Sequence, residues 1–539
     1  MVTTAVLGQP LTLPSGERLD NRLAKAAMTE GLADPLGRPS PDLIRLYRRW
    51  ADSGCGLLIS GNVQVDRLHL ERPGNVIIDR PPDAETMASL RALVQAARAG
   101  GAGFWMQICH AGRQTPRAVN LRPKGPSEVG VELPGKQFGQ PVALTEDEIR
   151  EAIGRFVLAA VTAREAGFTG VELHAAHGYL LSQFLSPRAN RRTDRWGGSL
   201  ENRARLLLDI VAGTRAAVGR DFTLAVKINS ADFQRGGFSA GDSLLVVDWL
   251  AAAGVDLVEI SGGTYEQPRM MDLDGIERPD LEGLTASTAA REGYFLQFAR
   301  EMRQRVGVPL MVTGGFRSAD GMARALDADG VSLIGIGRPL CTDLDGPARL
   351  LREGGALDRP ERRVRLGPGW LGPQSPLKTI KAINGFGMLY WYYQQLRHIA
   401  RTGELRPSLG VLAALVREQK AQAAWLAAAR ARPSDLAGEC PTGRDTGADP
   451  EDWHRRSRRP GSRSLHHLQA AVVESLDHLF RANAAVRKPC GTRTSGPAGP
   501  ARRRTRCAGC AITRPAAYPT SSRGFAAAPG TRSCSGRRR

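Results

Sequence analysis

The feature that most constrains the fold is a repeat of short apolar runs, each followed by a segment of helical length. Eight such runs are candidate strands, at Arg22 to Met28, Gly56 to Val63, Phe104 to His110, Val171 to His174, Thr223 to Asn229, Leu257 to Ser261, Leu310 to Thr313 and Val331 to Ile336. Strands that alternate with amphipathic helices indicate a parallel sheet, and eight units close a barrel. The sequence therefore predicts an α/β fold, a (β/α)8 TIM barrel.

Capping residues mark some of the connecting helices. Thr145 precedes a predicted helix over Glu146 to Ala166, and Ser199 precedes one over Leu200 to Val218. Near the N-terminus, Pro14-Ser15-Gly16 predicts the turn of a hairpin over Leu11 to Leu19. We expect this hairpin to plug the bottom of the barrel.

The pattern changes after the eighth strand, which suggests three regions. Residues 1–345 are predicted to form the barrel, and residues 346–430 a helical extension packed on it. Within the extension we expect an aromatic helix at Met388 to Arg401 and another at Val411 to Arg430. Residues 431–539 are rich in Arg, Pro, Gly, Ala and Ser with few large apolar side chains, so we expect a disordered basic tail.

The charge distribution argues against nucleic acid as a partner of the barrel. Of the net charge of +20, residues 431–539 carry +13 and the first 430 residues only +7. The N-terminus lacks a basic segment followed by an apolar one, and no apolar run reaches the roughly 18 residues that span a bilayer. Cys55, Cys109 and Cys341 stand singly, at no metal-ligand spacing. These features predict a cytoplasmic protein with reduced thiols and no membrane partner.

Polar residue types crowd the end of the fourth candidate strand. Val171 and Leu173 alternate with Glu172, and His174, His177 and Tyr179 follow where the strand pattern stops. In a barrel, side chains beyond the carboxyl ends of the strands face a common mouth, where the active site lies. These residues are therefore candidate catalytic groups.

The other strands contribute further polar residues to the same mouth. Thr29 follows the first strand, Gln107 lies within the third, and Lys227 lies within the fifth. Strands seven and eight lead into glycine-rich loops, where backbone N–H groups and a cation suit a phosphate. The candidate phosphate ligands are Gly314, Gly315, Gly337 and Arg338.

Several motifs together resemble the old yellow enzyme family of FMN-dependent reductases. They are NRLAKAAMTEG, HAGRQ, HAAHGYLLSQFLSPRANRRTDRWGGS, EISGGTYEQP and VTGGFR, and the resemblance covers roughly residues 5–430. It implies FMN as cofactor and NADH or NADPH as a transient hydride donor. Some members carry a cysteine cluster for an iron-sulfur centre after the barrel, but residues 341–430 hold only Cys341. The chain therefore resembles the single-barrel members.

The resemblance also implies roles for individual residues. Thr29 matches the residue that hydrogen-bonds the flavin C4 carbonyl, and Gln107 the residue at the pyrimidine edge. Lys227 matches a cation near flavin N1 and O2, where charge gathers on reduction. His174 and His177 match the pair that binds the substrate carbonyl oxygen, and Tyr179 matches the proton donor. The implied reaction moves hydride from NAD(P)H through the flavin to the β-carbon of an α,β-unsaturated carbonyl compound, and quinones and nitro compounds are further acceptors.

Other interpretations of the same residues remain open. His174 and His177 could form a metal pair, although no third ligand is evident and we expect no metal site. A flavin barrel that modifies RNA would suit the basic charge, but we find no catalytic cysteine motif for that reaction. The cationic tail could bind nucleic acid or acidic membranes. Lys227 could form a Schiff base, as in an aldolase.

Overall fold

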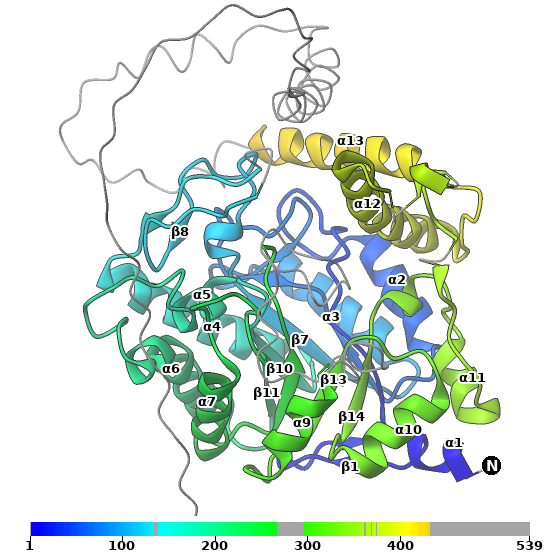
Figure 1. Ribbon diagram of the computed structural model, residues 1–539, viewed down its shortest axis with the longest axis horizontal. Coiled ribbons are helices and arrows are strands. Elements are labelled where there is room, and N and C mark those ends of the chain that lie inside the picture. The colour runs from blue at the N-terminus through cyan, green and yellow to red at the C-terminus, as the bar shows by residue number, and fades with distance from the viewer. Residues whose placement is uncertain are drawn as a thin grey trace, which may run out of the picture. The chain divides into compact units, whose positions relative to one another are not determined.

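The computed structural model describes residues 2–133, 137–266, 295–360, 363–367, 369–372 and 375–431. Eight parallel strands lie side by side in chain order. They close into a barrel because the eighth strand hydrogen-bonds to the first. The strands are β3 (Leu23–Lys25), β4 (Leu57–Ile59), β7 (Gly103–Cys109), β10 (Gly170–Ala175), β11 (Thr223–Asn229), β12 (Leu257–Ser261), β13 (Leu310–Thr313) and β14 (Leu333–Ile336). The predicted TIM barrel is confirmed (Figure 1).

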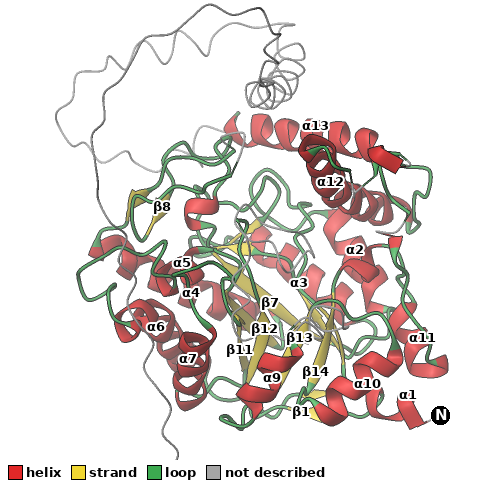
Figure 2. Ribbon diagram, in the orientation of Figure 1, coloured by secondary structure: helices red, strands yellow, loops and turns green. Residues whose placement is uncertain are grey.

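Helices follow the strands and surround the barrel (Figure 2). They are α2 (Pro41–Ala51), α3 (Ala84–Arg98), α4 (Glu146–Ala166), α6 (Leu200–Val218), α7 (Ala240–Ala252), α9 (Leu296–Arg303), α10 (Ala319–Ala328) and α11 (Gly346–Glu353). The predicted bounds of α4 and α6 are confirmed. Thr145 and Glu148 form a reciprocal capping box on α4, and the Ser199 side chain accepts a hydrogen bond from Asn202 N–H on α6.

Shorter elements lie before and between these units. They are α1 (Val2–Leu7), β1 (Leu11–Thr12), β2 (Arg18–Leu19), β5 (Val63–Gln64), β6 (Val76–Ile77), β8 (Lys124–Gly125), β9 (Val142–Ala143) and α5 (Leu180–Leu185), with 3-10 turns at Gly112–Gln114, Arg338–Cys341 and Gly369–Leu371. β1 and β2 pair antiparallel as the predicted hairpin. Leu11, Leu13 and Leu19 of the hairpin join the apolar cluster inside the barrel, so the hairpin does close its bottom.

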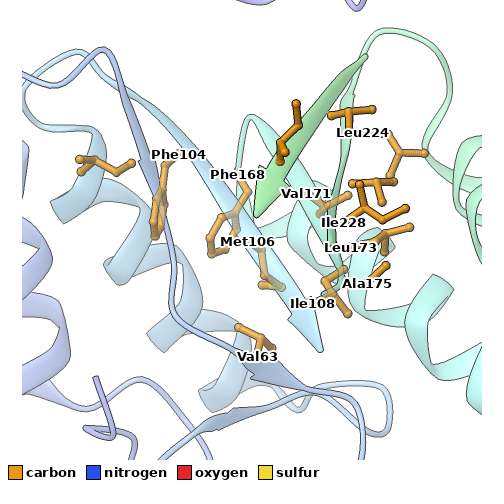
Figure 3. Packing of buried hydrophobic residues seen from close by; sticks show 14 of the residues in the cluster. Val63, Phe104, Met106, Ile108, Phe168, Val171, Leu173, Ala175, Leu224 and Ile228 are labelled. Carbon is orange, nitrogen blue, oxygen red and sulfur yellow. The ribbon is translucent and has the colours of Figure 1, made fainter. Parts of the chain in front are cut away.

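Alternation of side chains along the strands separates two cores. On β7, Phe104, Met106 and Ile108 face the helices, and Figure 3 shows them beside Val171, Leu173 and Ala175 of β10. Residues at the other positions point into the barrel, where Trp105 packs with apolar partners from the other strands. This alternation decides which residues of each strand reach the mouth of the barrel.

The extension contains α12 (Lys378–Thr402) and α13 (Val411–Arg430), which pack against each other, and α12 also packs on α2. The predicted bounds of α13 are confirmed, but the predicted start of the aromatic helix at Met388 is wrong. Asn384 and Gly387 made the preceding turns look unfavourable for a helix. In the structure the Asn384 amide donates to the carbonyls of Ile380 and Leu371, and Gly387 is needed because a Cβ there would overlap Val411.

Residues 432–539, for which a disordered basic tail is predicted, lie outside the described residues. Among the helices that the structure describes, none is long and apolar enough to cross a membrane.

Candidate active site

Polar side chains replace apolar ones toward the carboxyl ends of neighbouring barrel strands. In the register of the sheet, Gln107 on β7 pairs with Glu172 on β10, His174 on β10 with Lys227 on β11, and Lys227 with Glu259 on β12. All five side chains are buried. The inward positions of four adjacent strands therefore carry a charged layer above the apolar plug of the barrel.

Two short contacts organise this layer. Lys227 Nζ lies 2.7 Å from Glu259 Oε1, and the Gln107 amide donates to Glu172 Oε1 at 2.6 Å. Burial and the neighbouring Glu259 raise the pKa of Glu172 well above its usual range, whereas Lys227 lowers the pKa of Glu259. Glu259 in turn raises the pKa of Lys227 despite its burial. The pairing of Lys227 with Glu259 thus favours the charged forms of both side chains, whereas burial favours the neutral form of Glu172.

His174, His177 and Tyr179 gather above this layer. The His174 ring centroid lies 5.0 Å from that of His177 and 4.9 Å from that of Tyr179, and both ring pairs meet edge to face. Burial lowers the pKa of His177 to about 3, and burial beside His177 and Lys227 lowers the pKa of His174 well below its usual range. Both imidazoles are neutral at physiological pH. His174 Nδ1 accepts from Ala176 N–H at 3.2 Å, so its proton is on Nε2.

The backbone of His177 has a left-handed conformation, with φ of +62°. Two side chains hold it there. Asn229 Oδ1 accepts from His177 N–H at 3.1 Å, and the Gln114 amide donates to its carbonyl at 3.0 Å. The ring is fixed as well, because Nε2 lies 2.7 Å from Ser261 Oγ at the end of β12. A strained backbone that several groups fix in place is a common property of functional sites.

Tyr179 is linked by hydrogen bonds to Thr29, which follows the first strand of the barrel. Its hydroxyl lies 2.7 Å from the Tyr265 hydroxyl, which donates to Glu71 Oε1 at 3.2 Å. Glu71 also hydrogen-bonds the side chain of Thr29. Burial raises the pKa of Tyr179 and of Tyr265 well above the usual range for tyrosine. A chain of four side chains therefore joins the candidate proton donor to the candidate flavin contact.

The predicted glycine-rich loops lie side by side, since β13 and β14 pair with Thr313 beside Gly335. Gly314 and Gly315 have φ of +145° and +79°, conformations that favour glycine. Gly337 precedes a 3-10 turn that begins with Arg338. A Cβ at Gly337 would meet nothing nearer than Met28 Sδ at 3.9 Å. The loops thus offer backbone approachable from the mouth of the barrel, beside the segment that carries Thr29.

The structure brings the predicted residues into two connected groups. Lys227 faces both histidines closely enough that its charge lowers their pKa values, and Gln107 adjoins Lys227 through Glu172. Thr29 joins Tyr179 through Glu71 and Tyr265. Sequence reasoning missed these linking residues and Glu259, Ser261 and Asn229. Glu259, Ser261 and Asn229 could have been found, because they occupy inward positions at strand ends, whereas Glu71 lies in a loop with no such signal.

A second polar cluster lies apart from these residues. Asp66, His69 and His110 are the one group of potential metal ligands within the described ranges. His69 Nε2 accepts from Lys124 N–H at 2.8 Å, and His110 Nδ1 accepts from Gly112 N–H at 3.0 Å. Their remaining ring nitrogens face Asp66, which also pairs with Arg155 at 2.9 Å. The lone pairs that a metal would need are therefore used by backbone N–H groups.

The carboxyl-terminal mouth of this parallel (β/α)8 barrel carries a buried ion pair, two neutral imidazoles and two glycine-rich loops. These features define a barrel enzyme with a site for an anionic cofactor. The model of the NADH:flavin oxidoreductase / NADH oxidase family matches residues 7–353. The chain belongs to this family. This membership confirms the predicted old yellow enzyme type, the oxidoreductase class and the FMN cofactor. The sequence leaves NADH and NADPH open as hydride donors, and the similar flavin oxidoreductases named below are NADH-dependent.

Individual relatives agree with this assignment. An NADH-dependent flavin oxidoreductase of Neonectria sp. is 36% identical over 348 residues, which cover 62% of this chain and 45% of the relative. One from Talaromyces variabilis is 32% identical over 416 residues, with 74% of this chain and 99% of the relative covered. The structure of morphinone reductase has a TM-score of 0.53 and 27% identity, covering 66% of this chain and 91% of that one. This chain thus spans less than half of the Neonectria relative but nearly all of the Talaromyces one.

The residues at the barrel mouth fit FMN. The loop after β13 holds Gly314 and Gly315 at positive φ, the loop after β14 is open at Gly337, and Arg338 supplies a cation beside them. Lys227 is a buried ammonium that can face the polar edge of the flavin ring, and Gln107 supplies an amide beside it. The chemistry of these donors suits a planar group with hydrogen-bonding edges and an anionic tail.

Proposed function

We propose that this chain reduces an alkene conjugated to a carbonyl, with NADH as the source of hydride. The observation that carries the proposal is the convergence of two neutral imidazoles and one phenol on the same part of the mouth. Bound FMN would supply the hydride-transfer chemistry between NADH and the β-carbon of the acceptor. The remaining steps belong to side chains of this chain.

His174 and His177 would bind the carbonyl oxygen of the acceptor. His174 offers Nε2–H, because its Nδ1 already accepts from the backbone. His177 offers Nδ1–H when the Ser261 hydroxyl donates to Nε2. Two fixed donors stabilise the negative charge that develops on the oxygen during reduction. Because burial keeps both rings neutral, they can bind the oxygen without transferring a proton to it.

Tyr179 would protonate the α-carbon of the acceptor. It lies beside His174 and its hydroxyl is held by Tyr265, so it is fixed with respect to the bound carbonyl. For the cofactor, we assign Thr29 and Gln107 to the ring, Lys227 to its N1 and O2 edge, and Gly314, Gly315, Gly337 and Arg338 to the phosphate. These assignments agree with the order of the groups around the barrel.

The structure gives reasons to prefer this reaction to the alternatives. A Schiff base requires an uncharged amine, but Lys227 is paired with Glu259, which raises the pKa of the lysine. The thiol beside Tyr179 is Cys109, and burial raises its pKa well above the usual range. That thiol is therefore a poor candidate for the cysteine of an RNA-modifying enzyme.

Anaerobic absorption spectroscopy tests the proposal. Addition of NADH should bleach the yellow FMN-loaded protein, and addition of 2-cyclohexenone should restore the colour. In the variant His174→Asn, bleaching by NADH should persist while recolouring by the enone slows strongly. A bleached wild-type protein that the enone leaves colourless would contradict the proposed acceptor class.

A further inference from the structure

We propose that Glu71 is the source of the proton that Tyr179 delivers, and that Tyr265 passes it between them. This inference rests on the proposed function. It adds two residues to the reaction, a proton reservoir and a relay, neither of which lies on a barrel strand.

The geometry forms one continuous path. The Tyr179 and Tyr265 hydroxyls are 2.7 Å apart, and the Tyr265 hydroxyl is 3.2 Å from Glu71 Oε1. The three residues come from separate segments, the loops after β10, β12 and β5. Glu71 and Tyr179 are buried, and Tyr265 is half-buried. Side chains from distant segments meet here in an order that suits transfer of a proton.

The need for a relay follows from the cost of a buried tyrosinate. If Tyr179 gave up its proton alone, the charge would stay on a phenol whose pKa is raised by burial and by the nearby Tyr265 and Glu71. A carboxylate at Glu71 is better placed, because the adjacent Arg72 lowers the pKa of that carboxyl. Burial nevertheless leaves the pKa of Glu71 above its ordinary value, which favours the protonated carboxyl more than in an exposed glutamate.

Arg72 is held in place by the helical extension. Its guanidinium carbon lies 3.6 Å from the centre of the Tyr393 ring on α12, and it forms a buried ion pair with Glu418 on α13. Arg397 also contacts Glu418, at 3.3 Å. The groups that face Glu71 are Arg72, Thr29, Asn75, Tyr265, Tyr179, Cys109 from β7, and Tyr390 and Tyr393 from the extension.

The proton transfer balances without a change of oxidation state in the protein. The Tyr179 O–H bond breaks as the C–H bond at the α-carbon forms, and the Tyr265 proton moves to the Tyr179 oxygen. The Glu71 proton moves to the Tyr265 oxygen. Both tyrosines end neutral, Glu71 ends as a carboxylate beside Arg72, and Tyr265 then donates to it. A proton from bulk water restores the Glu71 carboxyl before the next turnover.

Two substitutions of similar shape test the relay. Tyr265→Phe removes the relay hydroxyl, and Glu71→Gln keeps an amide in place of the carboxyl. In stopped-flow measurements each should slow reoxidation of the reduced flavin by 2-cyclohexenone by about 100-fold, the lower end of general acid catalysis. Reduction by NADH and reoxidation by ferricyanide, which require no carbon protonation, should stay within about twofold of wild type.

The pH dependence and an infrared measurement give independent readouts. Since Glu71 must be protonated, the wild-type rate with the enone should fall as pH rises through the Glu71 pKa, and Glu71→Gln should lose this dependence. Infrared spectra of the FMN-loaded enzyme should show a protonated carboxyl that titrates above pH 4.5, the ordinary value, and that Glu71→Gln lacks. Glu17→Gln, which changes another carboxyl of raised pKa at the barrel bottom, should retain both properties. Tyr390→Phe is the matched control for Tyr265→Phe.

The outcomes separate the relay from the proposed function. If wild type is reoxidised by the enone and Tyr265→Phe matches it in rate and pH profile, the relay is wrong and the proposed function stands. The same conclusion follows if Glu71→Gln keeps the titrating carboxyl band. If the enone fails to reoxidise even wild type after bleaching by NADH, the proposed function itself is wrong.

Discussion

A neutral imidazole can donate from only one of its two nitrogens, so the group bound to the other nitrogen decides what the ring can do. At His177 that group is Ser261, whose hydroxyl can donate to Nε2 and leave the proton on Nδ1. At His174 the backbone N–H of Ala176 has the same effect on the opposite nitrogen. Two different hydrogen bonds thus fix the donor nitrogens of the two rings that we propose bind one carbonyl oxygen.

Ser261→Ala should therefore weaken acceptor binding without affecting the flavin. Loss of one hydrogen bond of about 1 kcal/mol, and with it the fixed tautomer, predicts a rise of about five- to tenfold in KM for 2-cyclohexenone. The rate of flavin reduction by NADH should be unchanged. Steady-state and stopped-flow kinetics measure the two quantities. Ser15→Ala removes a similar contact, 2.7 Å to Thr223 at the barrel bottom, and should leave KM unaltered.

The charged layer below the histidines supports a second prediction. Lys227→Met would leave Glu259 as a buried carboxylate without its cation, and the free energy of unfolding should fall by about 3–5 kcal/mol. The double variant Lys227→Met/Glu259→Gln removes both charges and should recover part of that loss. Urea unfolding followed by circular dichroism measures both. Equal stability of the single and double variants would contradict the expected destabilisation by an unpaired carboxylate at Glu259.

At the scale of elements, α12 and α13 contact the loop after β5 and the segment after β3. The contacts include hydrogen bonds and ion pairs made by individual side chains. Trp425 on α13 donates to the carbonyl of Ala33 at 3.0 Å, and Arg397 on α12 donates to the carbonyl of Gly31 at 2.9 Å. Glu418 is fully buried between Arg72 and Arg397. The extension therefore packs on the barrel through polar groups as well as through an apolar face.

Glu418→Gln tests this packing. It would leave two arginines facing each other without an anion, and the free energy of unfolding should fall by about 3–5 kcal/mol. Glu404→Gln, on an exposed turn of the same extension, should change it by less than about 0.5 kcal/mol. Chemical denaturation of both variants provides the comparison, and equal effects would show that the buried pairs are not what fixes α13.

At the scale of the whole molecule, buried neutral histidines link stability to pH. The pKa is about 3 for His177 and about 4 for His110, against the ordinary value of 6.5 that an unfolded chain would show. At a pH between the folded-state and the unfolded-state pKa of these histidines, the unfolded state binds more protons than the folded state. The free energy of unfolding therefore falls as pH falls from about 6.5 toward 4. The stabilisation is fully present above pH 6.5.

The melting temperature should accordingly drop between pH 7 and pH 5, as differential scanning calorimetry can measure. His110→Gln should be less stable than wild type at pH 7 but should lose less stability on acidification, because one titrating group is gone. A melting temperature that is constant from pH 7 to pH 5 would contradict the assignment of these rings as neutral.

The barrel was predictable because its signals are periodic. Strand-length apolar runs recur between helices with caps such as Thr145 and Ser199, and the structure has strands at all eight predicted places. The strand expected over Arg22 to Met28 is shorter, Leu23–Lys25, because the chain leaves the barrel where Thr29 approaches Glu71. The start of α12 was missed because tertiary contacts of Asn384 and Gly387 override their low helix propensity.

The candidate site was predictable only where it lies on strands. His174, Lys227 and Gln107 follow from the inward positions of a parallel barrel, and the structure links them as neighbours. Glu71 and Tyr265 reach Tyr179 from loops whose course depends on packing across the whole mouth. No local pattern in the sequence reports such a meeting of distant segments. The roles of these residues await the measurements above.

The left-handed backbone at His177 has a consequence for efforts to improve this protein. Glycine adopts that conformation without the steric cost of about 1–2 kcal/mol that a side chain brings. A laboratory selection that rewards heat resistance alone would therefore favour His177→Gly and would discard the imidazole. Under the proposed function, selection for a working catalyst would restore it. Selection for thermal stability and selection for catalytic activity thus favour different amino acids at position 177. Libraries built for stability should leave this position unchanged.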